Sequence, residues 1–195
     1  MPLAQADAPC PHCIGRGRSP LERIARLGTF DEPIKSLVHQ FKYHRQWVLG
    51  EMLADRLAEL TDAAGLLAGG DVLVPVPLHY VRQLSRGYNQ AEVLARRLAR
   101  RCGKPVAQVV RRVRNTETQT HLHSRARRIA NLRDAFALTD PDRIRGKNLI
   151  IVDDVLTTGA TVQSIARTLI PAGPASINAI VLAIADPKHR DFQAR

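Results

Sequence analysis

Four consecutive aliphatic residues at positions 149–152 constrain the fold more than any other part of the chain. A run without a polar interruption is typical of a strand that is covered on both faces, and such strands belong mainly to parallel sheets. A turn rich in threonine and glycine follows, and apolar residues then recur at helical spacing over residues 159–170. A strand, a tight turn and a helix in this order predict an α/β fold.

The same alternation of strand and helix patterns continues along the chain. Short runs of β-branched residues bounded by glycine or proline predict strands, and apolar residues at three-to-four spacing predict helices. The predicted strands are residues 72–76, 106–110, 135–138 and 177–184, and the other predicted helices are 31–62 and 89–101. We therefore expect a mostly parallel sheet flanked by helices.

Four segments of different composition divide the chain. An irregular arm rich in proline, glycine and arginine occupies residues 1–30, and a small helical hood is expected over residues 31–70. The α/β core is expected over residues 71–186, followed by a tail at 187–195.

The positive charge of the chain is concentrated in one segment. The formal net charge is +11, and residues 82–145 contain 16 basic and 5 acidic residues, whereas the other 131 residues carry 13 of each. This segment is predicted to face an anionic ligand, such as phosphate, pyrophosphate or a nucleic acid backbone. The alternative is a solvated surface that happens to be rich in arginine.

The residues after position 152 carry the most specific chemistry. Ligands of open α/β sheets bind beyond the carboxyl ends of the strands, where Asp153 and Asp154 are expected. The start of the following helix favours a phosphate group, and the carboxylates suit vicinal hydroxyls. The segment therefore predicts a site for a ribose 5-phosphate, with a solvated acidic pair as the alternative. The predicted phosphate-binding turn consists of Thr157, Thr158, Gly159, Ala160 and Thr161.

Two motifs together resemble a known family. The segment 149–161 resembles the signature of type I phosphoribosyltransferases, which bind 5-phosphoribosyl-1-pyrophosphate. The sequence Arg-Gly-Tyr-Asn-Gln at 86–90, after Val-Pro-Val-Pro-Leu at 74–78, looks like the ComF family, which includes competence-associated and GntX-type proteins. The resemblance covers roughly residues 30–186 and implies a type I phosphoribosyltransferase-like fold. It implies that Asp153 and Asp154 hold the ribose hydroxyls and that residues 157–161 hold the 5-phosphate.

The resemblance also implies a pyrophosphate loop that runs from Pro77 to Arg82 and Arg86. Arginine forks pair bidentately with phosphate oxygens, although both arginines could instead be ordinary surface charges. The implied reaction displaces pyrophosphate at the anomeric carbon, with Mg²⁺ on the pyrophosphate and an acceptor that no motif identifies. Asp153, Asp154 and Arg86 are the catalytic candidates.

A basic lid over residues 111–128 is expected to close over this site, with a loop of no catalytic role as the alternative. Its candidate residues are Arg112, Arg114, Gln119 and Arg128. Asn89 and Gln90 belong to the second motif, and the alternative to a functional role is that they cap the following helix, since asparagine is a favoured cap.

A second function is also compatible with the ComF resemblance. Proteins of this type take part in DNA uptake, and the arginine-rich segment could bind single-stranded DNA without turnover. The two functions differ in their salt dependence, because binding to a nucleic acid backbone weakens steeply with ionic strength.

The cysteines predict half of a zinc site. Cys10 and Cys13 form a CxxC pair, but a structural zinc ion needs four ligands, and Cys102 lies far along the chain. ComF-like proteins often carry an N-terminal four-cysteine module, so an upstream pair could precede the assigned start. An orphaned pair and a redox role are the alternatives. The absence of a leader pattern and of any apolar run near the ~20 residues of a membrane span favours a cytoplasmic protein.

Overall fold

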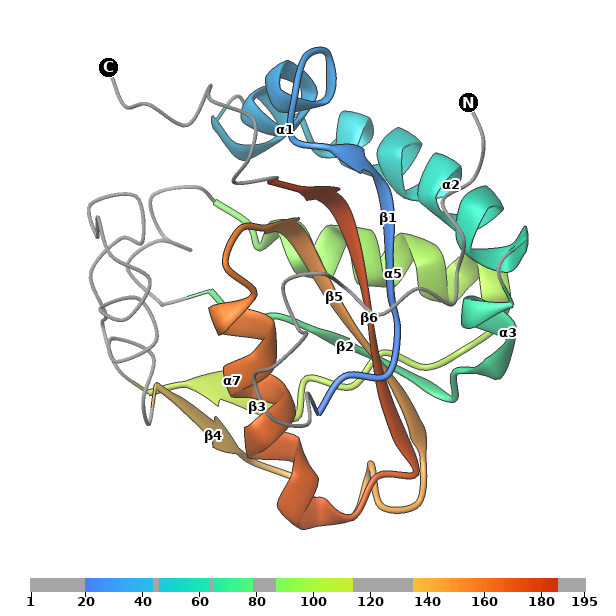
Figure 1. The fold of residues 1–195 in the computed structure, drawn as a ribbon, viewed down its shortest axis with the longest axis vertical. Coiled ribbons are helices and arrows are strands. Elements are labelled where there is room, and N and C mark those ends of the chain that lie inside the picture. Colours follow the sequence, from blue (N-terminus) through green and yellow to red (C-terminus); the bar gives the residue numbers. More distant parts are fainter. Residues whose placement is uncertain (1–19, 44–45, 64, 79–86, 114–134, 186–195) are drawn as a thin grey trace.

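The computed structural model describes residues 20–43, 46–63, 65–78, 87–113 and 135–185. Within these ranges, four parallel strands form a sheet in the order β1-β6-β5-β2 (Figure 1). The strands are β1 (Ile24–Thr29), β2 (Val72–Pro75), β5 (Asn148–Leu156) and β6 (Ser176–Ile184). The predicted mostly parallel sheet is confirmed.

Helices cover both faces of this sheet (Figure 1). One face carries α1 (Ile34–Tyr43), α2 (Trp47–Ala63), α3 (Leu66–Gly69) and α5 (Gln90–Cys102). The other face carries α7 (Ala160–Leu169), which continues as the short 3-10 helix η2 (Ile170–Ala172). It also carries an antiparallel pair of short strands, β3 (Val110–Arg112) and β4 (Phe136–Leu138).

The aliphatic run at 149–152 shows why the chain adopts this arrangement. Leu149 and Ile151 belong to the apolar cluster on the α7 side, whereas Ile150 and Val152 belong to the cluster under α2 and α5. Successive residues of a strand point to opposite faces of the sheet. All four side chains are fully buried because both faces are covered. A strand of this kind is stable only between two layers of helices.

Strand β1 differs from the irregular segment expected over residues 1–30. Residues 24–29 pair in parallel with β6 along the edge of the sheet. Ile24 packs against one apolar cluster and Leu27 against the other, although Arg26 between them interrupts the apolar pattern. Residues 1–19 of the expected arm lie outside the described residues.

The helix expected over residues 31–62 is two helices, α1 and α2, with a break between Tyr43 and Trp47. Helices α2 and α3 do not form a separate hood, because their buried leucines, such as Leu57 and Leu67, join the cluster beneath the sheet. Of the expected hood, α1 is the part that reaches the acidic pair, through Lys42.

Two further strands differ in length from their predictions. The strand expected at 106–110 is reduced to a single parallel bridge between Val106 and Leu73, and the regular strand β3 starts only at Val110. Strand β5 is longer than the expected run 149–152 and continues to Leu156. No helix in the described part of the chain is long and apolar enough to cross a membrane.

Candidate functional site

The carboxyl end of β5 carries the acidic pair. Because β5 stays paired with β6 through Asp153 and Val155, the two aspartates lie within the strand and not after it. Their side chains therefore point to opposite faces of the sheet: Asp153 toward the α7 side and Asp154 toward α1. The sequence places these carboxylates side by side, and the pleat of the strand separates them.

A small hollow lies where β5 leads into α7. Its lining consists of Asp153, Val155, Leu156, Thr157, Gly159, Ala160, Thr161 and Val162. Gly159 precedes α7 in the left-handed conformation, with φ of 72°, which a residue with a side chain rarely adopts. The hydroxyl of Thr158 accepts a hydrogen bond from the backbone N–H of Ala160 at 3.4 Å, which supports the start of the helix. One carboxylate, two threonines and the amino end of a helix therefore share one hollow.

Asp153 has an unusual protonation equilibrium. Burial, and after it the neighbouring charge of Asp154, raise the pKa of its carboxyl group to about 7. A hydrogen bond from the backbone N–H of Asp154 to Asp153 Oδ1, at 2.8 Å, opposes this shift, as do the charges of Lys42 and Arg112. A perturbed carboxyl group next to a hollow is a feature of functional sites.

Asp154 is held by a lysine from α1. Lys42 Nζ lies 2.9 Å from Asp154 Oδ1, and the two side chains are only 20% and 14% exposed. The end of α1 is fixed in turn by Tyr88, whose hydroxyl donates to the carbonyl of Phe41. Lys42 is not among the residues predicted from the sequence, because no local pattern marks a lysine at a helix end as the partner of a distant carboxylate.

The described part of the Arg-Gly-Tyr-Asn-Gln motif, residues 87–90, leads into α5. Gly87 has a positive φ of 81°, and Tyr88 packs against the Phe41 ring with centroids 5.8 Å apart. Asn89 Oδ1 accepts from the backbone N–H of Ala91 at 3.1 Å, and its amide nitrogen donates to the Val76 carbonyl at 3.0 Å. The helix-cap role of Asn89 is therefore confirmed.

The expected pyrophosphate loop starts beside the acidic strand. The Val76 N–H donates to the Val152 carbonyl at 2.9 Å, so Pro77 follows at the same carboxyl end of the strands as Asp153. Pro77 itself is half-buried. Arg82 and Arg86 lie outside the described residues.

Arg112, the first of the lid candidates, lies in strand β3. It pairs with Phe136 across the antiparallel strands β3 and β4, and its guanidinium carbon lies 5.7 Å from the centre of the Phe136 ring. Its charge nevertheless lowers the pKa of Asp153, which makes it part of the surroundings of the site. The remaining lid candidates, Arg114, Gln119 and Arg128, lie outside the described residues.

The structure gives no account of the expected zinc half-site, because Cys10 and Cys13 lie outside the described residues. Cys102 is half-buried near the end of α5, where its thiol contacts the Ala99 carbonyl at 3.8 Å. Among the residues that the structure describes, no three His, Cys, Asp or Glu side chains converge on a point where a metal ion could be held.

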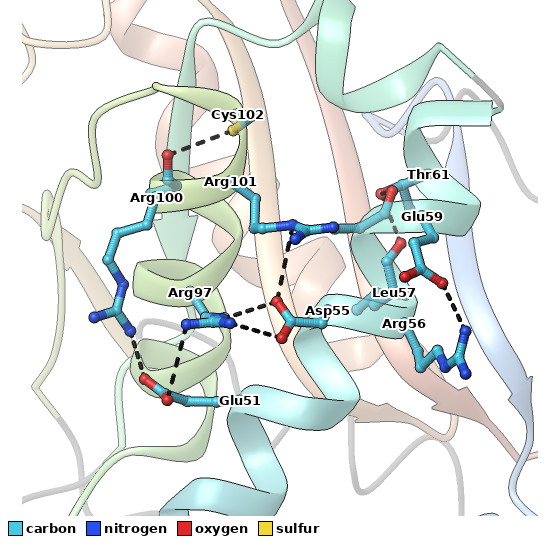
Figure 2. Close-up of polar contacts among 12 residues, drawn as sticks. Glu51, Asp55, Arg56, Leu57, Glu59, Thr61, Arg97, Arg100, Arg101 and Cys102 are labelled. Carbon is cyan, nitrogen blue, oxygen red and sulfur yellow. Dashed lines mark hydrogen bonds and ion pairs between the residues drawn. The ribbon is translucent and has the colours of Figure 1, made fainter.

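The arginines of α5 are paired with acidic residues, many of them from another part of the chain (Figure 2). Arg97 forms a bidentate contact with Asp55 of α2, at 2.8 and 2.7 Å. Arg100 pairs with Glu51, and Arg101 lies 3.9 Å from Asp55. The expectation that the basic segment faces an anionic ligand therefore does not hold for these arginines, whose charge α2 largely offsets.

Comparison with known proteins places the chain in a family. The phosphoribosyl transferase domain matches residues 83–193. The chain is 36% identical over 181 residues to the DNA utilization protein YhgH of Salmonella typhimurium, which covers 91% of this chain and 78% of the relative. It is 34% identical over 165 residues to competence protein F of Haemophilus influenzae, covering 82% and 71%. The chain belongs to the ComF family, with a phosphoribosyltransferase fold.

A solved structure is also similar to this ComF-family chain. It is the glutamine phosphoribosylpyrophosphate amidotransferase from B. subtilis complexed with ADP and GMP, with 20% identity and a TM-score of 0.47. The similarity covers 68% of this chain and 25% of the other. Strands β1 and β2 and helices α1 and α2 precede the residues that match the phosphoribosyl transferase domain.

Proposed function

We propose that this ComF-family protein binds 5-phosphoribosyl-1-pyrophosphate at the carboxyl end of β5. The hollow shared by Asp153 and the turn 157–161 carries the proposal. The amino end of α7 and the threonine hydroxyls suit the 5-phosphate, and the Asp153 carboxylate suits the ribose hydroxyls. Asp154, the second expected hydroxyl acceptor, lies on the other face of β5.

The pyrophosphate group would extend toward the loop that starts at Pro77. This loop begins at the carboxyl end of β2, next to the carboxyl end of β5, and Arg82 and Arg86 follow it in the sequence. Mg²⁺ would enter as part of the ligand, bound to pyrophosphate oxygens, where it would stabilise the negative charge of the leaving group.

The proposed reaction is a displacement at the anomeric carbon. The bond from this carbon to a pyrophosphate oxygen breaks, its electron pair leaves with the pyrophosphate, and an acceptor nucleophile forms the new bond. Asp153 and the turn 157–161 would position the sugar phosphate while positive charge develops on the ribose. The acceptor is not specified by the described residues.

Calorimetry tests this proposal directly. Wild-type protein is titrated with phosphoribosyl pyrophosphate with and without Mg²⁺, beside D153N and the control D142N. Asp142 is 84% exposed and pairs with Arg145 on a surface turn, so D142N changes a carboxylate without touching the hollow. We expect binding that requires Mg²⁺, is weakened about 100-fold in D153N and is unchanged in D142N. Wild-type affinity in D153N would place the sugar elsewhere.

A second candidate function is the binding of single-stranded DNA. The relatives are named for DNA utilization and competence, and residues 111–133 contain further basic residues outside α5. We expect such binding to weaken with salt, with a log–log slope of about −0.7 per phosphate contacted. D153N should leave DNA binding intact, and a loss of both activities in D153N would indicate that the two ligands share one site.

A further inference from the structure

Lys42, in the last turn of α1, contacts Asp154 of the acidic pair, and the predicted site assigns this lysine no role. We propose that Lys42 is a positioning residue that holds Asp154 against α1, so that Asp153 alone of the pair contacts the ribose hydroxyls. This inference rests on the proposed function and assigns different tasks to two adjacent carboxylates.

The ion pair is shielded from water. Lys42 Nζ and Asp154 Oδ1 are 2.9 Å apart, and at least four-fifths of each side chain is covered. A covered ion pair loses much when one partner is removed, because the other charge then stays buried without compensation. Lys42 therefore holds the Asp154 carboxylate toward α1.

The backbone next to Lys42 is fixed from two sides. Phe41 is fully buried, and its ring packs so closely on Gly50 of α2 that an added Cβ there would overlap it. From the other side, Tyr88 donates its hydroxyl hydrogen bond to the Phe41 carbonyl. The lysine is thus presented by a rigid helix end, which is what a positioning role requires.

Asp153 has a different environment on the other face of β5. Its Oδ1 accepts the backbone N–H of Asp154, and its carboxyl group lines the hollow with Thr157, Gly159 and Thr161. Lys42 and, to a smaller extent, Arg112 act on Asp153 through their charges, but no ion pair holds Asp153 as Lys42 holds Asp154 among the contacts that the structure describes. The pleat of β5 therefore directs Asp153 toward the hollow and Asp154 toward α1, and Lys42 holds Asp154 there.

The test measures the affinity for Mg²⁺-phosphoribosyl pyrophosphate by calorimetry in seven proteins. These are wild type, D153N, D154N, K42M, K42R and the double variant K42M/D154N, with K35M as a matched control. Lys35 is an exposed lysine on the same helix. Urea unfolding and hydrogen exchange of α1 accompany each titration and show whether each variant is folded.

We expect D153N to weaken binding by about 100-fold, as loss of a charged hydrogen-bond acceptor does. K42M and D154N should each weaken it by about tenfold, and the double variant should be no worse than D154N, because both changes remove one pair. K42R, which keeps the positive charge, should retain most of the wild-type affinity, and K35M should bind as wild type does. A role of Lys42 in folding alone would change the protection of α1 without this pattern in the affinities.

Three results would overturn the inference. If D154N weakens binding as much as D153N does, Asp154 itself contacts the sugar. If the effects of K42M and D154N multiply, the two residues act independently. If wild-type protein fails to bind the ligand, the proposed function is wrong and the role of Lys42 falls with it. Should K42M not fold, the affinities of D153N, D154N and K42R still show whether Asp153 alone contacts the sugar.

Discussion

Asp153 should reduce the stability of the folded protein at neutral pH, and D153N tests this. Burial raises the pKa of Asp153 from its usual 3.8 to about 7, so the folded state binds this proton more tightly than the unfolded state does. The stability linked to this proton is fully present below pH 3.8 and is lost as the pH rises through about 7. A shift of this size corresponds to an upper limit of about 4 kcal/mol at alkaline pH.

Asparagine has nearly the same shape and carries no charge. Its side-chain carbonyl can still accept the Asp154 N–H, so D153N removes the charge and keeps that hydrogen bond. We expect D153N to be more stable than wild type by about 2–4 kcal/mol at pH 8 and nearly equal to it at pH 4.

Urea unfolding of both proteins at a series of pH values measures this difference. D142N, on an exposed turn, should follow wild type within about 0.5 kcal/mol throughout. A D153N variant that is less stable than wild type at pH 8, or that differs by the same amount at every pH, would refute the reasoning. Stabilisation together with lost ligand binding would mark Asp153 as a residue retained for function.

Further predictions concern the turn, the core and the surface. G159A should lose about 1–2 kcal/mol of stability, because φ is 72° there, and should weaken phosphoribosyl pyrophosphate binding in calorimetry. G103A, at φ of 67° beyond α5, should lose similar stability and bind normally. F41A should lose about 3–5 kcal/mol in urea unfolding, because Phe41 is fully buried. R97A should lower the urea midpoint more than R56A does, because the Arg97–Asp55 pair is less exposed than the Arg56–Glu59 pair. The difference between the two midpoints should shrink in high salt.

Local patterns were sufficient to predict the central part of the fold. The run 149–152 requires burial on both faces, and Gly159 with the apolar spacing after it requires a turn followed by a helix. These features depend on neighbours in sequence. The turn after β5 is also local, because Thr157, Gly159, Ala160 and Thr161 are close in the chain and line one hollow; that this turn binds a phosphate group stays a prediction.

Features that depend on distant pairing could not be predicted. Strand β1 is stabilised by hydrogen bonds to β6, and Arg26 within it obscures the strand pattern. Aspartates are poor strand formers, yet β5 continues through Asp153 because β6 offers a partner at Val181. The separation of the two carboxylates follows from this extension.

Charge counting along the chain has the same weakness. The excess of arginine over residues 82–145 takes no account of acidic residues that another helix brings into contact. Asp55 and Glu51 of α2 meet Arg97 and Arg100 of α5 only in the folded protein. Lys42 is a single basic residue in an unremarkable position, and only tertiary structure shows that it pairs with Asp154.

The position of β1 has a consequence for synthesis of the protein on the ribosome. Strand β1 is made before its neighbour β6, so the nascent chain must keep β1 unpaired until the ribosome has also synthesised β6. A fragment beginning at residue 83, where the domain match starts, would lack both β1 and β2. Strands β5 and β6 would then each present a bare edge, and such edges promote aggregation between chains.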